Sequence, residues 1–140
     1  MAFRLNNVLL VPRPTYKELP VVSGLAITLG DVLRIVNGEW DLCATNEIPA
    51  GVSMTPGTVT GVADDSVTVQ GVLTYGCIFE VPQGANTDAN TQVGDTLDIN
   101  ATSDGVTTTN NADFKVYAHD RDKNLLYGFF SIGNGAVFPI

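Results

Sequence analysis

The sequence carries its clearest structural signal in LGDVLRIVNGEWDLCA, residues 29 to 44. Asn37 and Gly38 near its centre readily take the positive φ angles that a tight two-residue hairpin turn requires. The flanking residues are rich in the β-branched and aromatic types that suit a pleated strand. We therefore expect a hairpin in which residues 32–36 pair with residues 39–44.

The start of this stretch has a second copy further along the chain. Residues 29–35 read LGDVLRI and residues 93–99 read VGDTLDI. In both, Gly gives the backbone freedom that a tight turn needs, and Asp can hydrogen-bond to its own backbone. We expect each phrase to be a turn that starts a strand, without a ligand.

Other turn signals recur at short intervals. Asp64-Asp65 is expected to join strand 59–63 to strand 66–70, and Asp104-Gly105 and Asn134-Gly135 to mark further hairpins. No stretch of ten or more residues has a helical apolar stripe free of Gly, Pro or β-branched clusters. The sequence predicts an all-β fold, either a compact β-barrel or a β-sandwich.

The 140 residues are enough for one domain with its own core. We expect this β domain over residues 25–140, preceded by an extended N-terminal arm over residues 1–24. Within the arm, Val8, Leu9, Leu10 and Val11 are apolar on both faces of a strand, and prolines follow. The segment could lie against another subunit or form an edge strand of its own subunit, and the sequence leaves both open.

Residues 125–132 near the C-terminus are also apolar on both faces of a strand. The outer face must then be covered, either by loops of the same chain or by a neighbouring subunit. The second alternative places Tyr127, Phe129 and Phe130 in a subunit interface.

Charge is unevenly distributed along the chain, whose net charge is -8. Residues 1–34 hold four Lys and Arg against two acids, whereas residues 35–114 hold eleven acids and no Lys or Arg. This acidic body disfavours nucleic acid, whereas Arg4 and Arg13 in the arm could bind an acidic partner. No apolar run is long enough for a membrane helix, and no secretory signal is recognisable, so we expect a soluble protein made in the cytoplasm.

We find no residues with the pattern of a catalytic, metal or cofactor site. The one histidine, His119, is expected on the exposed face of a strand with Lys115 and Tyr117. Asp120-x-Asp122-x-Asn124 begins like a calcium loop, but the later positions do not fit, so a polar turn is expected. Cys43 and Cys77 are expected to be free, buried thiols.

In their order along the chain, these pieces resemble the small capsid decoration, or cement, proteins of tailed bacteriophages. The resemblance spans roughly residues 24 to 132. The matching pieces are Gly30-Asp31-Val32, Asn37-Gly38, Gly51-Val52, Val67-Thr68-Val69-Gln70-Gly71 and Gly94-Asp95-Thr96-Leu97.

The resemblance implies a barrel-like or tulip-shaped domain that assembles as a homotrimer on the outer capsid surface of the virion. It implies that the major capsid protein is the partner and that binding stabilises the expanded shell. The family has no catalytic residues to transfer. The arm is longer here than in the simplest members, so its docking cannot be carried over.

The alternative function is a glycan- or ligand-binding β-sandwich module of a virion or cell surface. Such a module displays exposed aromatic side chains beside polar groups, and Trp40 is the one tryptophan available. Alternation places Trp40 on the same strand face as Leu42 and Ala44, opposite Glu39 and Asp41. We therefore expect Trp40 in the core.

Overall fold

A computed structural model of the 140-residue chain describes residues 2–8, 13–44, 47–74, 77–83, 91–107 and 113–130. Every helix or strand within these ranges is a β-strand, and all the strand pairs are antiparallel. The all-β prediction is confirmed. The strands are β1 (Arg4–Val8), β2 (Tyr16–Pro20), β3 (Ala26–Thr28), β4 (Val32–Val36), β5 (Glu39–Leu42), β6 (Gly51–Ser53), β7 (Thr58–Thr60), β8 (Thr68–Leu73), β9 (Cys77–Pro82), β10 (Thr96–Ile99), β11 (Val106–Thr107), β12 (Phe114–Asp120) and β13 (Leu125–Phe130).

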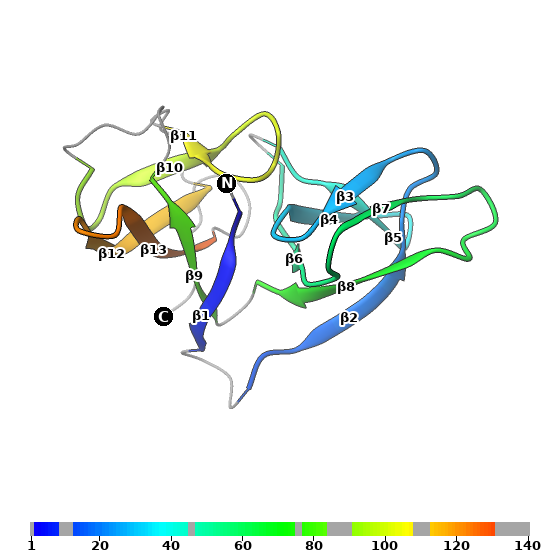
Figure 1. The fold of residues 1–140 in the computed structure, drawn as a ribbon, viewed down its shortest axis with the longest axis horizontal. Coiled ribbons are helices and arrows are strands. Elements are labelled where there is room, and N and C mark those ends of the chain that lie inside the picture. The colour runs from blue at the N-terminus through cyan, green and yellow to red at the C-terminus, as the bar shows by residue number, and fades with distance from the viewer. Residues whose placement is uncertain are drawn as a thin grey trace.

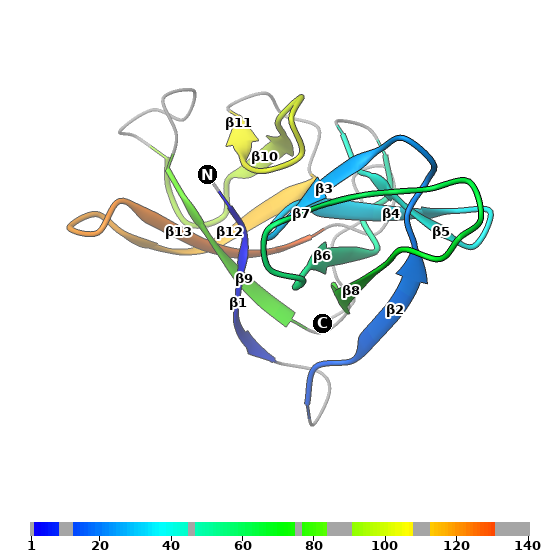
Figure 2. The ribbon, with the colours of Figure 1, turned by 45° about the vertical axis from the view of Figure 1, so that its right-hand side comes forward.

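The strands form three sheets, which lie in two neighbouring lobes (Figure 1). One lobe is a six-stranded sheet in the order β1-β9-β13-β12-β10-β11. The other combines a five-stranded sheet, β2-β8-β6-β4-β5, with the small β3-β7 sheet, as Figure 2 also shows. The five-stranded sheet curls, because Val21 after β2 forms a bridge with Trp40 of β5. The described strands do not close into a barrel.

A large hydrophobic core contains residues from both lobes. Val32, Val52 and Val72 of the five-stranded sheet belong to one buried cluster with the apolar side chains of the six-stranded sheet. An aromatic group lies within it, with neighbouring ring centroids 4.9 to 5.6 Å apart. Its members are Phe3, Phe79, Phe114 and Phe130. The lobes therefore share a core.

A second, smaller core lies in the curl of the five-stranded sheet around Trp40. The indole is fully buried, and its Nε1 donates a hydrogen bond of 2.9 Å to the Val69 carbonyl. The ring lies against Gly51 and Gly71, where a Cβ would come within 2.9 and 2.7 Å of it. The expectation that Trp40 is a core residue is confirmed.

Two of the predicted hairpins are present. Asn37 and Gly38 have φ angles of 51° and 81° and join β4 to β5. β10 and β11 also form a hairpin around Asp104-Gly105, but the positive φ angle there belongs to Ser103. Asn134-Gly135 lies outside the described residues.

The predicted hairpin at Asp64-Asp65 is wrong in its strand partners. A turn does occur there, and Asp65 has a positive φ angle of 58°. The strand before it, β7, pairs with β3, whereas the strand after it, β8, pairs with β2 and β6. The turn therefore carries the chain from one sheet to another.

The two Gly-Asp phrases form the same turn. Gly30 and Gly94 have φ angles of 88° and 95°. Asp31 Oδ2 accepts a hydrogen bond of 2.8 Å from the Thr28 amide, and Asp95 Oδ2 accepts one of 2.9 Å from the Gln92 amide. Each turn leads directly into a strand, β4 or β10, so the prediction from the repeated phrase is confirmed.

The likeness of the two turns extends to whole sheets. In one lobe β5, β4, β6, β8 and β2 lie side by side in that order, and in the other lobe β11, β10, β12, β13 and β9 do the same. Chain order matches too: β2, β4, β5, β6 and β8 follow one another along the chain as β9 to β13 do, apart from β3 and β7, which form the small sheet. We call β2, β4, β5, β6 and β8 the first unit, and β9 to β13 the second unit.

Strand register shows that the units correspond residue by residue. Gly71 on β8 lies opposite Lys17 and Ser53, and Gly128 on β13 lies opposite Phe79 and Val116. The two glycines therefore occupy equivalent positions.

The same equivalence holds at the turns. The Ser53 amide donates to the Asp31 carbonyl, and the Val116 amide donates to the Asp95 carbonyl, both at 2.9 Å. The chain thus contains the same five-stranded arrangement twice.

Candidate partner-binding surface

The N-terminal segment forms edge strands of the subunit's own sheets, which is one of the two alternatives that the sequence left open. β1 pairs with β9, so that Arg4 lies opposite Glu80. β2 pairs with β8 along its whole length. Leu9, Leu10 and Val11 lie outside the described residues, and of Val8 only the backbone in β1 is described.

Phe3 packs the beginning of this segment into the large core. Its side chain is 2% exposed and packs against Phe114 and Phe130, and its amide donates a 3.1 Å hydrogen bond to the Gly30 carbonyl. Val21, which follows β2, is fully buried in the second core. The residues 1–24 therefore contribute to both cores. No sequence pattern pointed to Phe3, because a lone aromatic residue before a short strand has no periodic partner.

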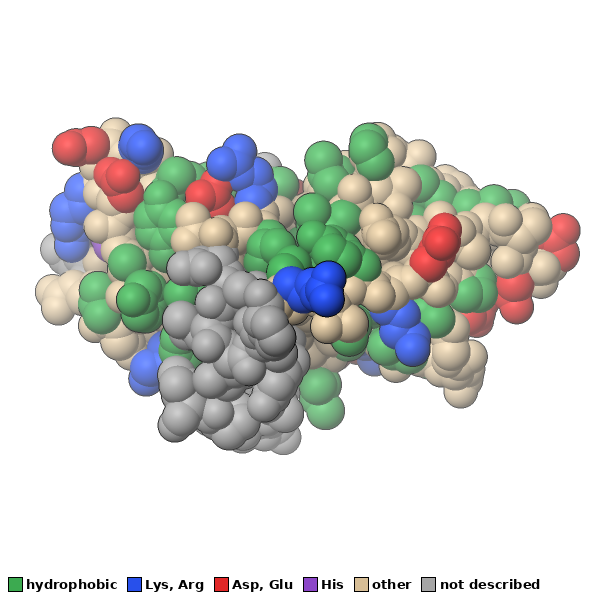
Figure 3. All heavy atoms as spheres, turned by 90° about the horizontal axis from the view of Figure 1, so that it is seen from below, with side chains coloured by type: hydrophobic (Ala, Val, Ile, Leu, Met, Phe, Trp, Pro, Cys, Tyr) green, Lys and Arg blue, Asp and Glu red, His purple; other side chains and the backbone are tan. Residues whose placement is uncertain are grey.

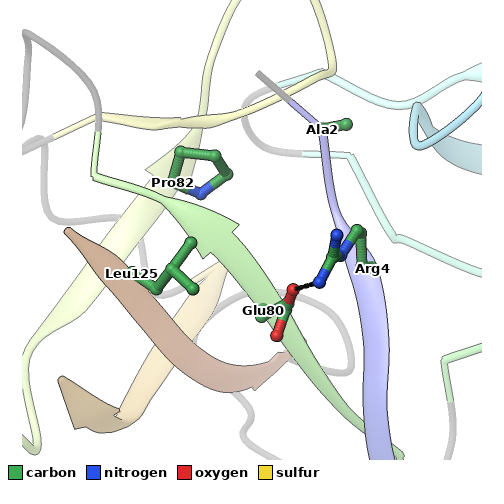
Figure 4. A pocket seen from close by; sticks show the side chains of 5 residues that line it. All are labelled: Ala2, Arg4, Glu80, Pro82 and Leu125. Carbon is green, nitrogen blue, oxygen red and sulfur yellow. Dashed lines mark ion pairs between the residues drawn. The ribbon is translucent and has the colours of Figure 1, made fainter. Parts of the chain in front are cut away.

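A hollow of about 200 Å³ lies where β1 meets β9 and β13. Figure 4 shows the side chains around it, with Arg4 directed toward the carboxylate of Glu80. The Glu80 side chain is 11% exposed, whereas that of Arg4 is 74% exposed. Ala2, Pro82 and Leu125 make the rest of the lining apolar. A carboxylate at the wall of an apolar hollow is thus neutralised by one exposed cation.

The edge strand β2 and the residues just before it form the other part of this surface. Arg13, Tyr16 and Lys17 are all exposed, and Tyr16 retains 46% of its accessible area. Figure 3 shows the molecule from the side on which β1 and β2 lie: acidic side chains occur toward the two ends of this face, and Lys or Arg side chains also lie in its middle. The two edge strands therefore expose basic groups on an otherwise acidic chain.

The three aromatic side chains that we predicted in a subunit interface differ in how far they are exposed on the subunit. Phe130 is 1% exposed and belongs to the aromatic group of the large core, so its side chain is already covered within the subunit. Phe129 is 7% exposed and is also buried. Tyr127 is partly exposed and lies next to Glu80 in the sheet. Of the three, only Tyr127 is accessible to a partner.

His119 is more constrained than the sequence predicted. A bulge near Tyr117 interrupts the strand alternation, and His119 is partly buried. Its Nδ1 lies 3.1 Å from the Thr91 carbonyl, and its Nε2 lies 2.8 Å from Gln83 Oε1. Both ring nitrogens are engaged in connecting β12 to the segments around it, so the imidazole has a structural role.

The calcium-like phrase is a turn, as expected. Residues 121–124 form the turn between β12 and β13, and Asp120 Oδ1 accepts a 3.1 Å hydrogen bond from the Lys123 amide. Asn124 has a positive φ angle of 59°.

Both cysteines are free and buried, as predicted. Burial, with a smaller effect of the Glu47 and Asp113 charges, raises the pKa of the Cys43 thiol to about 12. Burial also raises the pKa of Cys77. Both thiols are therefore poor nucleophiles at neutral pH.

An ion-pair network holds the outer part of the first unit together. Arg34 Nε and Nη2 donate hydrogen bonds of 3.0 and 2.7 Å to Asp41 Oδ2, and Nη1 forms an ion pair with Glu47. Arg34 and Asp41 are cross-strand neighbours on β4 and β5. The pKa of Arg34 is raised chiefly by its hydrogen bond with Asp41. The positive charge of Arg34 is thus paired with acidic side chains of the same subunit.

Among the described residues, no group of three or more His, Cys, Asp or Glu side chains is placed to hold a metal ion. The part of the chain that the structure describes includes no helix that is long and apolar enough to cross a membrane. Comparisons with protein-family models, curated proteins and solved structures found no match to this chain.

Proposed function

We propose that the chain is a capsid decoration protein, which binds the major capsid protein on the outer surface of a tailed-phage head and stabilises the shell. The observation that carries the proposal is the pair of edge strands β1 and β2, which together with Arg13 before β2 expose Arg4, Arg13 and Lys17 on an acidic molecule. The homotrimer and the tulip-shaped fold implied by the sequence resemblance are part of this proposal.

Two physical features support a binding role. Open sheet edges offer unpaired backbone groups to a partner, and the side chains on them give specificity. Basic side chains on an acidic body favour an acidic partner surface, whereas the acidic parts of two copies repel each other. A capsid-binding role requires binding features of this kind and no catalytic site.

The proposal is tested with purified protein and expanded, undecorated heads of the phage that encodes it. We expect saturable co-sedimentation and a higher temperature of head disruption when the protein is bound. Light scattering should give the mass of a trimer. A monomeric mass together with no binding to heads would exclude this function.

The residue that best suited the glycan-binding alternative, Trp40, is not accessible to a sugar. Trp40 is fully buried, and among the described residues the exposed aromatic side chains are those of Tyr16 and Tyr117. These two residues lie on different sheets. Specific binding on a glycan array, with no binding to heads, would favour this alternative.

A further inference from the structure

The two units differ at one edge. In the second unit, β9 pairs with β13 on one side and with β1 on the other. In the first unit, the equivalent strand β2 pairs with β8, but no described strand occupies the position that corresponds to β1. Among the described strands, the first unit therefore has an open edge where the second unit has an additional antiparallel strand.

The hydrogen bonds at the two ends of β2 show which of its backbone groups point away from β8. The Leu73 amide donates to the Thr15 carbonyl at 2.8 Å, and the Val21 amide donates to the Val67 carbonyl at 3.2 Å. Thr15 and Val21 thus face β8, and in an antiparallel ladder alternate residues face the same way. Tyr16 and Glu18 must then direct their N–H and C=O groups away from β8.

The open edge ends at the C-terminal end of β2, near Pro20 and Val22. The Val22 amide, which has the same phase as Tyr16 and Glu18, donates a 3.1 Å hydrogen bond to the Trp40 carbonyl of β5. Pro20 has no N–H group to donate. The amides available to another strand are therefore those of Tyr16 and Glu18, both exposed residues.

The acidic side chain of Glu18 at this edge indicates that a strand bound here would carry a basic residue. Glu18-Leu19-Pro20 at the end of β2 corresponds in register to Glu80-Val81-Pro82 at the end of β9. Arg4 of β1 forms an ion pair with Glu80. Glu18 accepts a 2.8 Å hydrogen bond from Thr68 Oγ1, but within the described residues it has no basic partner.

We propose that the open edge of β2 accepts an extended strand of a different protein, antiparallel to β2, with an Arg or Lys opposite Glu18. Binding would place the incoming strand on Tyr16 and Glu18 as β1 is placed on β9, and would neutralise Glu18 as Arg4 neutralises Glu80. This inference rests on the proposed function only in that the head protein would supply the strand.

A second copy of this chain fits the edge poorly. Each copy has one β1 strand but two edges of this kind, so exchange of β1 between copies always leaves one edge open. Self-pairing of two β2 edges would need Tyr16 or Glu18 in hydrogen-bonded positions. A pairing centred on Lys17 or on Glu18 places two like charges directly opposite each other, which is destabilising. A pairing centred on Tyr16 places Glu18 opposite Pro14, which has no N–H group to donate, and gives Glu18 no basic partner.

The first test uses the chain's own β1 sequence as the probe. An N-acetylated, C-amidated peptide of residues 2–8 (AFRLNNV) is added to isotope-labelled protein, and amide hydrogen exchange is followed by NMR. We expect exchange at Tyr16 and Glu18 to slow at least about tenfold, because both amides become hydrogen-bonded. A peptide with the change Arg4→Glu should protect them much less. No protection at Tyr16, or protection confined to β9, would overturn the inference.

A matched pair of variants separates the backbone from the side chain. Glu18→Pro and Glu18→Ala both lose the hydrogen bond from Thr68, but only Glu18→Pro removes the outward amide. Glu18→Ala should still show peptide-dependent protection at Tyr16, whereas Glu18→Pro should not. Equal protection in both variants would contradict strand addition.

If Glu18→Pro does not fold, as judged by loss of exchange protection at Lys17 and Leu19, Glu18→Lys takes its place. This variant keeps the backbone and reverses the charge, so it should prefer the Arg4→Glu peptide over the original one. An unchanged preference would overturn the charge assignment.

Binding to phage heads then distinguishes this inference from the proposed function. Loss of binding in Glu18→Pro, with Glu18→Ala still bound, supports both. Equal binding of both variants leaves the proposed function standing and excludes the edge as the docking point. Peptide protection without any binding to heads supports the edge and excludes the function.

Discussion

At the scale of single residues, glycines make room for the aromatic side chains of the cores. Trp40 lies against Gly51 and Gly71, and Phe114 lies against Gly128 at the position equivalent to Gly71. Strand alternation was enough to predict Trp40 in the core. The glycines were not predicted as packing sites, because a glycine in a sequence is a turn signal unless the aromatic ring above it is known.

Cys43 gives a residue-scale prediction about alkaline pH. Its pKa is raised to about 12 in the folded protein from a usual value of 9.0, so the folded state holds the thiol proton more tightly than the unfolded state does. Stability from this group is therefore complete below about pH 9 and decreases as pH rises toward 12. The limiting slope is about 1.4 kcal/mol per pH unit.

We expect Cys43→Ala to be less stable than the original protein at pH 7 but to lose stability less steeply above pH 9. Urea unfolding at several pH values measures both slopes, and the other titrating groups contribute equally to each. Parallel slopes in the two proteins would show that the Cys43 thiol is not protected in the folded state.

At the scale of elements, hairpins were predictable and sheet partners were not. The Asn37-Gly38 turn lies between two strands that pair with each other, so local sequence contains all of the information. The Asp64-Asp65 turn has equally good turn residues, but its flanking strands belong to different sheets. That choice depends on which side chains are buried across the whole molecule, and no local pattern reports it.

The two Gly-Asp turns give a matched element-scale prediction. An alanine at either Gly30 or Gly94 must adopt a positive φ angle, which costs about 1 to 2 kcal/mol. A Cβ at Gly94 meets none of the described atoms within 4 Å, whereas one at Gly30 would clash with Ala2 and the Phe3 backbone. Gly30→Ala should therefore cost about 1 to 3 kcal/mol more than Gly94→Ala.

Urea unfolding compares the two variants, and amide exchange shows where the difference arises. The additional loss in Gly30→Ala should be accompanied by faster exchange in β1, because Ala2 and Phe3 are displaced. Equal losses of stability, with β1 unaffected in both, would mean that β1 does not depend on this contact.

At the scale of the whole molecule, the duplicated arrangement was only partly visible in the sequence. The repeated Gly-Asp sequence was recognisable, but other equivalent segments have few residues in common. Residues 18–20 and 80–82, for example, share only a Glu and a Pro on either side of an apolar residue. Strand register makes them equivalent, and register depends on distant partners. For the same reason the edge of β2 could not be predicted, since its importance comes from comparison with the occupied edge of β9.

The shared core leads to the last prediction, which concerns cooperativity. Two similar units could unfold separately, but the large core contains side chains from both, and Phe3 joins Phe130 of the second unit to the turn of the first through Gly30. We therefore expect one two-state transition. Trp40, the single tryptophan, lies in the first unit and reports on it by fluorescence, whereas far-UV circular dichroism reports on the strands of both. The two signals should give the same midpoint in urea.

Phe130→Ala, a change in the second unit that should cost about 3 to 5 kcal/mol, should lower the Trp40 midpoint as much as the circular dichroism midpoint. The exposed variant Lys123→Ala should move neither. A Trp40 midpoint that does not change in Phe130→Ala would show that the two units unfold independently and that the shared core does not couple them.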